Sequence, residues 1–187
     1  MRNKNIHIHS VEKSGALDSS FRHRFQNPGK ILSDYLHPGM TVLDLGCGPG
    51  FFTIGMACML DSSSKVIAAD IQTGMLEKVK QKIEESDLEC IVQIHQCQEK
   101  SLNLTDKIDF VFAFYSFHEM SYPDEIIDEI KLLLKPGGLV YIAEQKFHVS
   151  KSSFIDIIEK MRKKGFEITS QPKVFLSRAV VMKMKEQ

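Results

Sequence analysis

The stretch Val42-Leu43-Asp44-Leu45-Gly46-Cys47-Gly48-Pro49-Gly50 decides the fold of this chain. Residues 41–45 are β-branched and aliphatic apart from one acid, a composition typical of a parallel strand that is covered on both faces. The three glycines at alternate positions allow a tight turn and let a ligand approach the backbone where a β-carbon would block it. Residues 51–60 follow with helical apolar spacing. The sequence therefore predicts a strand, a glycine loop and a helix.

A carboxylate beside this loop indicates the kind of ligand that it takes. Asp44 stands two positions before the first glycine, where it would repel a pyrophosphate and attract a ligand that carries an ammonium and a sulfonium. S-adenosylmethionine is such a ligand. The loop also departs from the nicotinamide fingerprint G-x-G-x-x-G, because Gly50 comes one residue early. The alternative is a strand-to-helix turn whose glycines serve only packing.

Asp70 supports the ligand interpretation independently. It ends the apolar run of residues 65–70, and it lies about 20 residues beyond the glycines, where an acid can accept both hydroxyl protons of a ribose. The order of strand, glycine loop, helix, strand and acid is that of a βαβ unit with a nucleoside site built into it.

On these residues, the chain resembles class I S-adenosylmethionine-dependent methyltransferases over roughly residues 27–187. The motif VLDLGCGPG carries the resemblance, and LLLKPGGLVYIAE at residues 132–144 is also similar to that family. The resemblance implies a doubly wound α/β fold, Rossmann-like, with a mostly parallel seven-stranded sheet of order 3-2-1-4-5-7-6 and helices on both faces. The chain is broadly similar to the ubiquinone/menaquinone and arsenite methyltransferase groups, although no cysteine set suited to trapping a metalloid can be assigned.

Apolar periodicity and turn residues predict the remaining elements. Helices are expected over residues 28–36, 73–86, 122–134 and 154–164. Further strands are expected over residues 90–95, 108–114, 139–143, 166–170 and 174–183. The last two strands are joined by only three residues, so they should pair antiparallel.

The resemblance also implies which residues hold the cofactor, S-adenosylmethionine. These are Asp44, Gly46, Cys47, Gly48, Gly50, Asp70, Ile71, Cys97, Gln98 and Phe114. The family usually carries an acid beside the adenine where this chain has Cys97. The adenine hydrogen bond would then come from the Gln98 side chain or from a backbone amide. The alternative for this segment is a plain polar loop.

The loop after the strand at residues 108–114 should face the methyl acceptor, because ligands of open α/β sheets bind where the strand order reverses. His118 and Glu119 are the candidate catalytic residues, since an imidazole titrates near neutral pH and can take a proton from a hydroxyl, thiol or amine. A pocket-lining or capping role is the alternative for His118, and Glu119 could orient His118 or bind a cationic acceptor. The loop lacks the Asn/Asp-Pro-Pro-Tyr signature of enzymes that methylate amide or exocyclic amino nitrogens. Candidate acceptor-binding residues are Tyr115, Glu144, His148 and Arg178. A solvated loop is the alternative for Glu144 and His148, and an exposed outward position is the alternative for Arg178.

Composition excludes several classes of function. The 24 basic and 24 acidic residues create no global field for nucleic acid, and no apolar run reaches transmembrane length. The four cysteines form no C-x-x-C pair, so we expect reduced thiols, no metal site and a cytoplasmic protein. Residues 1–26 are expected to be a tail or a lid, and residues 27–187 the methyltransferase domain. In a lid, Arg22 and Arg24 could face an anionic acceptor, although a solvated helix start is the alternative. The oligomeric state is not indicated.

The function expected from the sequence is in-line transfer of a methyl group from S-adenosylmethionine to an unidentified, small-molecule acceptor. Correct alignment of the acceptor with the methyl carbon can supply much of the rate acceleration, so a general base is optional. One alternative is a non-catalytic module that binds S-adenosylmethionine as a sensor or partner subunit. A nicotinamide oxidoreductase is disfavoured by Asp44 and by the glycine spacing.

Overall fold

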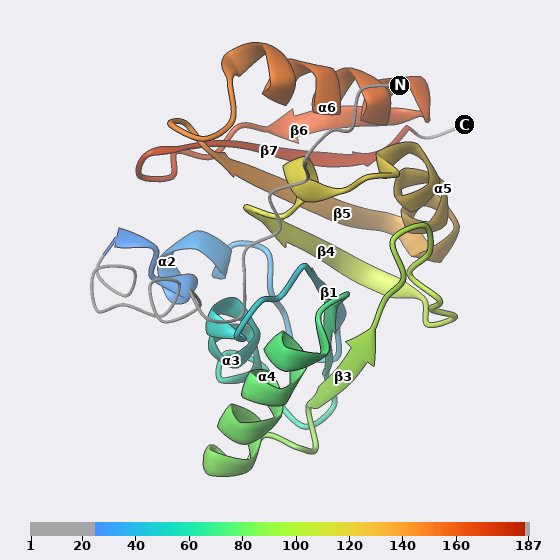
Figure 1. Ribbon diagram of the computed structural model, residues 1–187. Helices are drawn as coiled ribbons and strands as arrows, with labels where there is room; N and C mark the ends of the chain where they lie inside the picture. The colour runs from blue at the N-terminus through green and yellow to red at the C-terminus, as the bar shows by residue number, and fades with distance from the viewer. Residues whose placement is uncertain (1–24, 186–187) are drawn as a thin grey trace.

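A seven-stranded sheet of order β3-β2-β1-β4-β5-β7-β6 forms the centre of the computed structural model, which describes residues 25–185 (Figure 1). The strands are β1 Thr41–Leu45, β2 Lys65–Asp70, β3 Val92–Gln96, β4 Ile108–Phe114, β5 Leu134–Gln145, β6 Phe166–Ser170 and β7 Ser177–Met184. Strands β1 to β5 pair in parallel, and β7 runs antiparallel between β5 and β6. The doubly wound class and the strand order expected from the sequence are confirmed.

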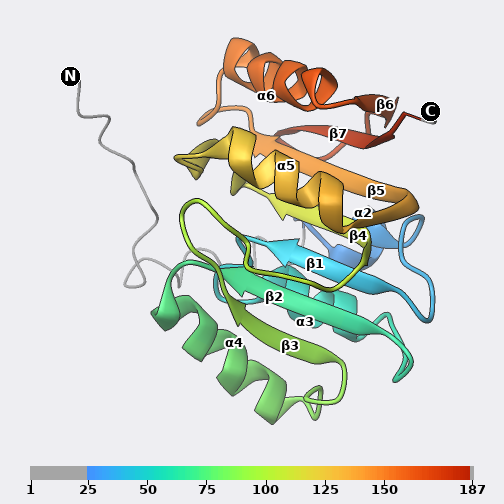
Figure 2. The same cartoon turned by 90° about the vertical axis from the view of Figure 1, so that its right-hand side faces the viewer.

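Helices cover both faces of the sheet, as Figure 2 shows with α5 in front of the strands and α2 and α3 behind them. Within residues 25–185 the helices are α2 Pro28–Leu32, α3 Phe51–Ala57, α4 Thr73–Glu85, α5 Pro123–Leu133 and α6 Lys151–Lys163, and η2 is a 3-10 turn at Phe117–Glu119. A hydrophobic core lies on each face of the sheet, and neighbouring residues of β1 belong to different cores. Val42 packs with α2, α3 and α4, whereas Leu43 packs with α5 and α6. The two cores hold the strand ends in fixed positions.

Capping residues explain several helix boundaries. The Asn27 side chain accepts a hydrogen bond from the Lys30 amide at 3.1 Å, so α2 begins at the proline that the sequence indicates. Helix α6 begins earlier than expected, because the Ser150 hydroxyl caps it by accepting from the Ser153 amide at 3.0 Å. Helices α2 and α3 end earlier than expected, at Leu32 and Ala57.

Three strands also differ from expectation. Strand β3 spans Val92–Gln96 instead of residues 90–95. Strand β5 spans Leu134–Gln145 instead of residues 139–143, and its pairing with β4 shifts register between Ile108 and Phe110. Strand β7 begins at Ser177 instead of Val174, because Leu176 has a φ of 53° and turns the chain before the ladder begins.

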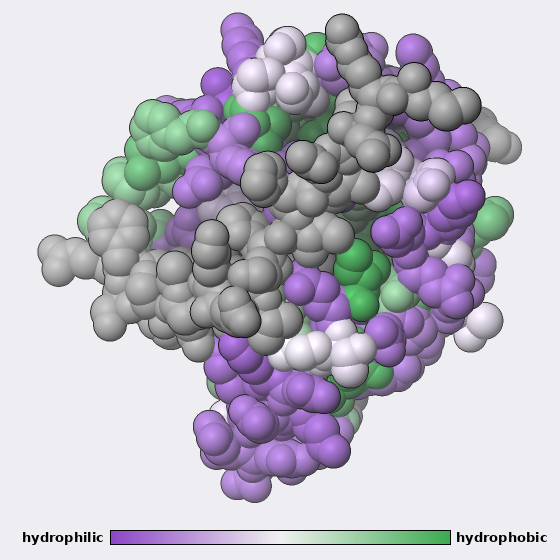
Figure 3. Space-filling view, in the orientation of Figure 1, coloured by the Kyte–Doolittle hydropathy of each residue, from purple (hydrophilic) through white to green (hydrophobic). Residues whose placement is uncertain are grey.

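Polar side chains dominate the surface at the lower end of the molecule, where α4 lies (Figure 3). Its apolar positions, which include Leu76, Val79 and Ile83, face the sheet. Among residues 25–185, no helix is long and apolar enough to cross a membrane.

Candidate functional site

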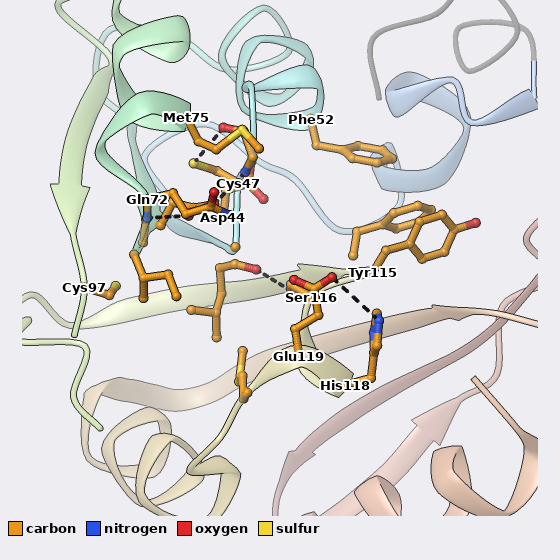
Figure 4. A pocket seen from close by; sticks show the side chains of 18 of the residues that line it. Asp44, Cys47, Phe52, Gln72, Met75, Cys97, Tyr115, Ser116, His118 and Glu119 are labelled. Carbon is orange, nitrogen blue, oxygen red and sulfur yellow. Dashed lines mark hydrogen bonds and ion pairs between the residues drawn. The ribbon is translucent and has the colours of Figure 1, made fainter. Parts of the chain in front are cut away.

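The carboxyl ends of β1, β2 and β4 open into one cavity of about 430 Å³. This is the edge at which open α/β sheets bind ligands, and the volume lies within the range of small-molecule sites. The loop after β3 forms a further side of the cavity, and Phe25 and Phe175 lie at its rim. Figure 4 shows Cys97 and Gln72 at one end of the cavity and Tyr115 and His118 at the other.

The glycine loop fits a bound nucleoside. The amides of Gly46 and Cys47 both donate to the carbonyl oxygen of Ala69, at 2.8 and 3.0 Å, which fastens the loop to β2. Gly48 has a φ of +54°, and a β-carbon added there would meet nothing within 4 Å. Gly48 therefore leaves open space beside its backbone, which a bound ligand can occupy and which a side chain would fill. Gly50 does not line the cavity; it packs against Val79 of α4 instead.

Asp70 stands at the end of β2 and ties the glycine loop to the start of α4. One carboxylate oxygen accepts from the Gly48 amide and the other accepts from the Gln72 amide, both at 2.9 Å. Burial raises the pKa of Asp70, although these hydrogen bonds oppose the rise. A carboxylate can accept about four hydrogen bonds in all, so Asp70 can also receive a ribose hydroxyl.

Asp44 lies under the same loop and is only 3% exposed. The Thr53 hydroxyl of α3 donates to one of its oxygens at 2.6 Å, which fixes the carboxylate where it borders the cavity. A buried carboxylate in this position favours a ligand that is positively charged.

The two cysteines of the cavity behave as apolar lining. Burial raises the pKa of Cys47 well above its ordinary value, and Asp44 and Asp70 add to the rise. Burial likewise raises the pKa of Cys97 to about 12. Both side chains therefore stay protonated thiols near neutral pH and are not nucleophiles. Ile71, Gln98 and Phe114 also line the cavity, as expected for cofactor contacts.

His118 lies at the opposite end of the cavity and is held by a buried carboxylate. Its backbone amide donates to one oxygen of Glu144 at 3.0 Å, and its Nδ1 lies 2.7 Å from the other. The Glu144 side chain is completely buried, whereas that of His118 is 15% exposed. The Nε2 atom has no hydrogen-bond partner within the described residues and lies 3.9 Å from the nearer Glu119 oxygen.

This arrangement fixes both the orientation and the tautomer of the His118 ring. Because Nδ1 faces a carboxylate, the neutral ring carries its proton there and presents Nε2 as a proton acceptor. Burial lowers the pKa of His118, but the hydrogen bond to Glu144 and the charges of Glu144 and Glu119 outweigh it, so the pKa lies above its ordinary value.

The candidate acceptor-binding residues divide into two groups. Tyr115 and His148 line the cavity, and the His148 ring meets the His118 ring edge-on with centroids 4.9 Å apart. Glu144 does not line it, because it lies behind His118. Arg178 does not line it either, since its guanidinium donates to the carbonyl oxygen of Val149 at 2.9 Å.

Tyr115 is held in an unusual backbone conformation for a residue other than glycine, with a φ of 63°. Its hydroxyl accepts from the Gln26 side chain at 2.7 Å and lies 2.5 Å from the Ser177 hydroxyl. The ring is thereby fixed at the His118 end of the cavity (Figure 4).

Several lining residues were not identified from the sequence. They are Gln26, Phe52, Gln72, Met75 and Phe175, and Thr53 supports the site from behind. Gln72 and Met75 could have been found, since they open the helix that directly follows Asp70. Within residues 25–185, no group of three or more histidine, cysteine or acidic side chains could hold a metal ion.

Comparisons with known proteins agree with this geometry. A family model described as "Methyltransferase domain" matches residues 36–184. A solved structure of a SAM dependent methyltransferase from Aquifex aeolicus aligns with a TM-score of 0.85 and 26% identity, over 94% of this chain and 98% of that chain.

Two curated relatives are similar at the level of sequence. Demethylmenaquinone methyltransferase of Symbiobacterium thermophilum is 25% identical over 162 residues, which cover 80% of this chain and 64% of that protein. Carboxy-S-adenosyl-L-methionine synthase of Hydrogenovibrio crunogenus is 27% identical over 136 residues, which cover 72% and 53%. The chain thus spans between half and two thirds of the length of these relatives. With its fold, its glycine loop and its matching family model, the chain belongs to the class I S-adenosylmethionine-dependent methyltransferases.

Proposed function

We propose that this chain transfers a methyl group from S-adenosylmethionine to a small-molecule acceptor, and that His118 removes a proton from that acceptor. S-adenosylmethionine is the cofactor of the family. The observation that carries the proposal is the continuity of one cavity from Gly48 and Asp70 to His118. A module that only bound the cofactor would have no need of an oriented proton acceptor at the far end.

The glycine loop and the ends of β1 and β2 would hold the cofactor. Gly48 leaves its backbone accessible, Asp70 can accept a ribose hydroxyl, and Asp44 favours the cationic portion of the molecule. When bound, the cofactor supplies an electrophilic methyl group on a sulfonium. The chain must then keep the acceptor aligned, which is the largest contribution expected of its own residues.

His118 is proposed to act through Nε2 as the general base. Glu144 is a positioning residue: it touches neither cofactor nor acceptor, but it fixes the ring and stabilises the imidazolium that forms when the proton arrives. Glu119 lies beside the same nitrogen and adds negative charge where positive charge develops.

The test is the formation of S-adenosylhomocysteine by protein loaded with S-adenosylmethionine and offered a panel of small acceptors. Turnover above the protein-free rate is expected, and His118→Gln should lower it while S-adenosylhomocysteine binds with unchanged affinity. Tight cofactor binding without turnover of any acceptor would favour the non-catalytic alternative.

A further inference from the structure

The acceptor end of the cavity carries negative charge. Asp44, Asp70, Glu99 and Glu119 line the cavity, and Glu144 lies directly behind His118. Among the lining residues within 25–185 none is lysine or arginine, and Arg22 and Arg24 of the expected lid lie outside the described residues. Asp44 and Asp70 border the cofactor end, so Glu119 is the carboxylate that an acceptor next to His118 would meet. An anionic acceptor is repelled there, whereas an uncharged or cationic one is not.

Aromatic rings also line the cavity, and those of Phe52 and Tyr115 lie across from Glu119 and His118 (Figure 4). The Phe114 ring packs against Phe52, with centroids 4.4 Å apart, and against Tyr115, with centroids 4.3 Å apart. At the rim, Phe25 stacks on Phe175 with centroids 4.5 Å apart. All five rings line the cavity. Rings fixed in this way offer a planar ligand offset-stacked or edge-to-face contacts, which aliphatic ligands of the same size cannot use as well.

The proton acceptor lies between these two features. His118 Nε2 is buried and has no hydrogen-bond partner within residues 25–185, while Nδ1 is engaged by Glu144. A buried nitrogen of this kind is satisfied by a ligand that donates a hydrogen bond to it. The methyl acceptor must therefore carry a hydrogen-bond donor close to its own ring, so that the donor proton is within reach of His118 Nε2.

We infer that the methyl acceptor is a planar aromatic compound without negative charge that presents a hydroxyl or amino group to His118 Nε2. The inference rests on the proposed function and specifies its substrate class. In the step itself, the O–H or N–H bond breaks and its proton passes to Nε2. The oxygen or nitrogen lone pair forms the new bond to the methyl carbon, and the carbon–sulfur bond breaks with its electron pair returning to sulfur.

Four small probes test the class: phenol and aniline are uncharged aromatic donors, benzoate carries a negative charge and no donor, and cyclohexanol is a donor without an aromatic ring. Phenol, aniline, benzoate and cyclohexanol are titrated into the protein saturated with S-adenosylhomocysteine, and each dissociation constant is measured by calorimetry. Phenol or aniline should bind at least about tenfold more tightly than benzoate and cyclohexanol. Whichever of phenol and aniline binds more tightly indicates whether the methylated atom is oxygen or nitrogen. Benzoate or cyclohexanol binding as tightly as phenol and aniline, or no binding of any probe, would overturn the inference.

A matched pair of variants tests whether Glu119 is the source of the charge selection. Glu119→Gln should reduce the preference for phenol over benzoate at least about threefold, because a charge beside the probe is removed. Glu167→Gln removes the same charge at a position that does not line the cavity, where Glu167 pairs with Lys183, and should leave the preference unchanged. An equal effect of both variants would show that the selection does not arise at Glu119.

The two proposals fail separately. If the wild-type protein does not bind S-adenosylhomocysteine, the proposed function falls and the probe titrations have no complex to examine. If S-adenosylhomocysteine binds and benzoate is preferred, only the acceptor class is wrong.

Discussion

The Ser116 hydroxyl donates a hydrogen bond of 2.6 Å to the carbonyl oxygen of Leu45. This contact joins the loop after β4 to the end of β1, across the point where the strand order reverses. Gly46 lies directly beside it, and a β-carbon on Gly46 would overlap the β-carbon of Ser116. These contacts therefore fix the position of the cofactor end of the cavity relative to its acceptor end.

Gly46 and Gly48 provide a matched pair of substitutions. Both have positive φ, so alanine costs about 1–2 kcal/mol of backbone strain at either position. Gly46→Ala must also displace Ser116, which adds about 1–3 kcal/mol of overpacking. Urea unfolding should therefore show the larger loss of stability for Gly46→Ala.

Gly48→Ala places its methyl group in open space within the cavity. Its loss of stability should be limited to the backbone strain. It should bind S-adenosylmethionine more weakly, because the methyl group occupies the open space beside the loop backbone. Equal losses of stability for the two variants would show that Ser116 does not confine Gly46.

Asp70→Asn should raise the dissociation constant of S-adenosylmethionine by about tenfold to a hundredfold, since charge-assisted hydrogen bonds contribute about 1.5–3 kcal/mol. Isothermal titration measures the change. Asp106→Asn is the control, because Asp106 pairs with Lys65 at 2.7 Å and does not line the cavity. A dissociation constant that is the same for both variants would remove Asp70 from the site.

The pH dependence of turnover should report the His118–Glu144 pair. His118 acts as a base only when neutral, so turnover should rise with pH through a pKa that lies above the ordinary histidine value. Glu144→Gln removes the strongest cause of the raised pKa, so the rising limb should move to lower pH while the plateau falls. If the rising limb of the pH profile stays at the same pH in Glu144→Gln as in the wild type, Glu144 only supports the fold.

The same pair should make stability depend on pH. Because the pKa of His118 is raised on folding, its protonated form adds stability that is complete below the unfolded value of about 6.5. This stability is lost as the pH rises through the folded pKa. His118→Gln should abolish that part of the pH dependence of unfolding, whereas His37→Gln, at an exposed position, should keep it. Superimposable stability curves for wild type and His118→Gln would contradict the assignment.

Local sequence was sufficient for the features that short segments determine. The run that ends in Gly50 predicts the first βα unit, and the position of Asp70 at the end of β2 follows from the next apolar run. The sheet order came from resemblance to a family, because spacing alone cannot show which strands are neighbours. Element ends were less accurate where one side chain decides them, as Ser150 does for α6.

The role of Glu144 could not be predicted from local sequence. His118 lies in the turn after β4, and Glu144 lies 26 residues later in β5. Their contact depends on the parallel pairing of β4 with β5, which places Phe114 opposite Ala143. Arg178 shows the same limit, since it faces Glu144 across the β5–β7 ladder yet bonds the backbone of Val149.

The most direct test of the account is a calorimetric titration of the folded protein with S-adenosylmethionine, S-adenosylhomocysteine and NAD. The account predicts saturable, one-site binding of the first two and no heat of binding with NAD, because Asp44 borders the cavity and disfavours a pyrophosphate. Binding of NAD at comparable affinity, or binding of none of the three by protein that is demonstrably folded, would contradict it.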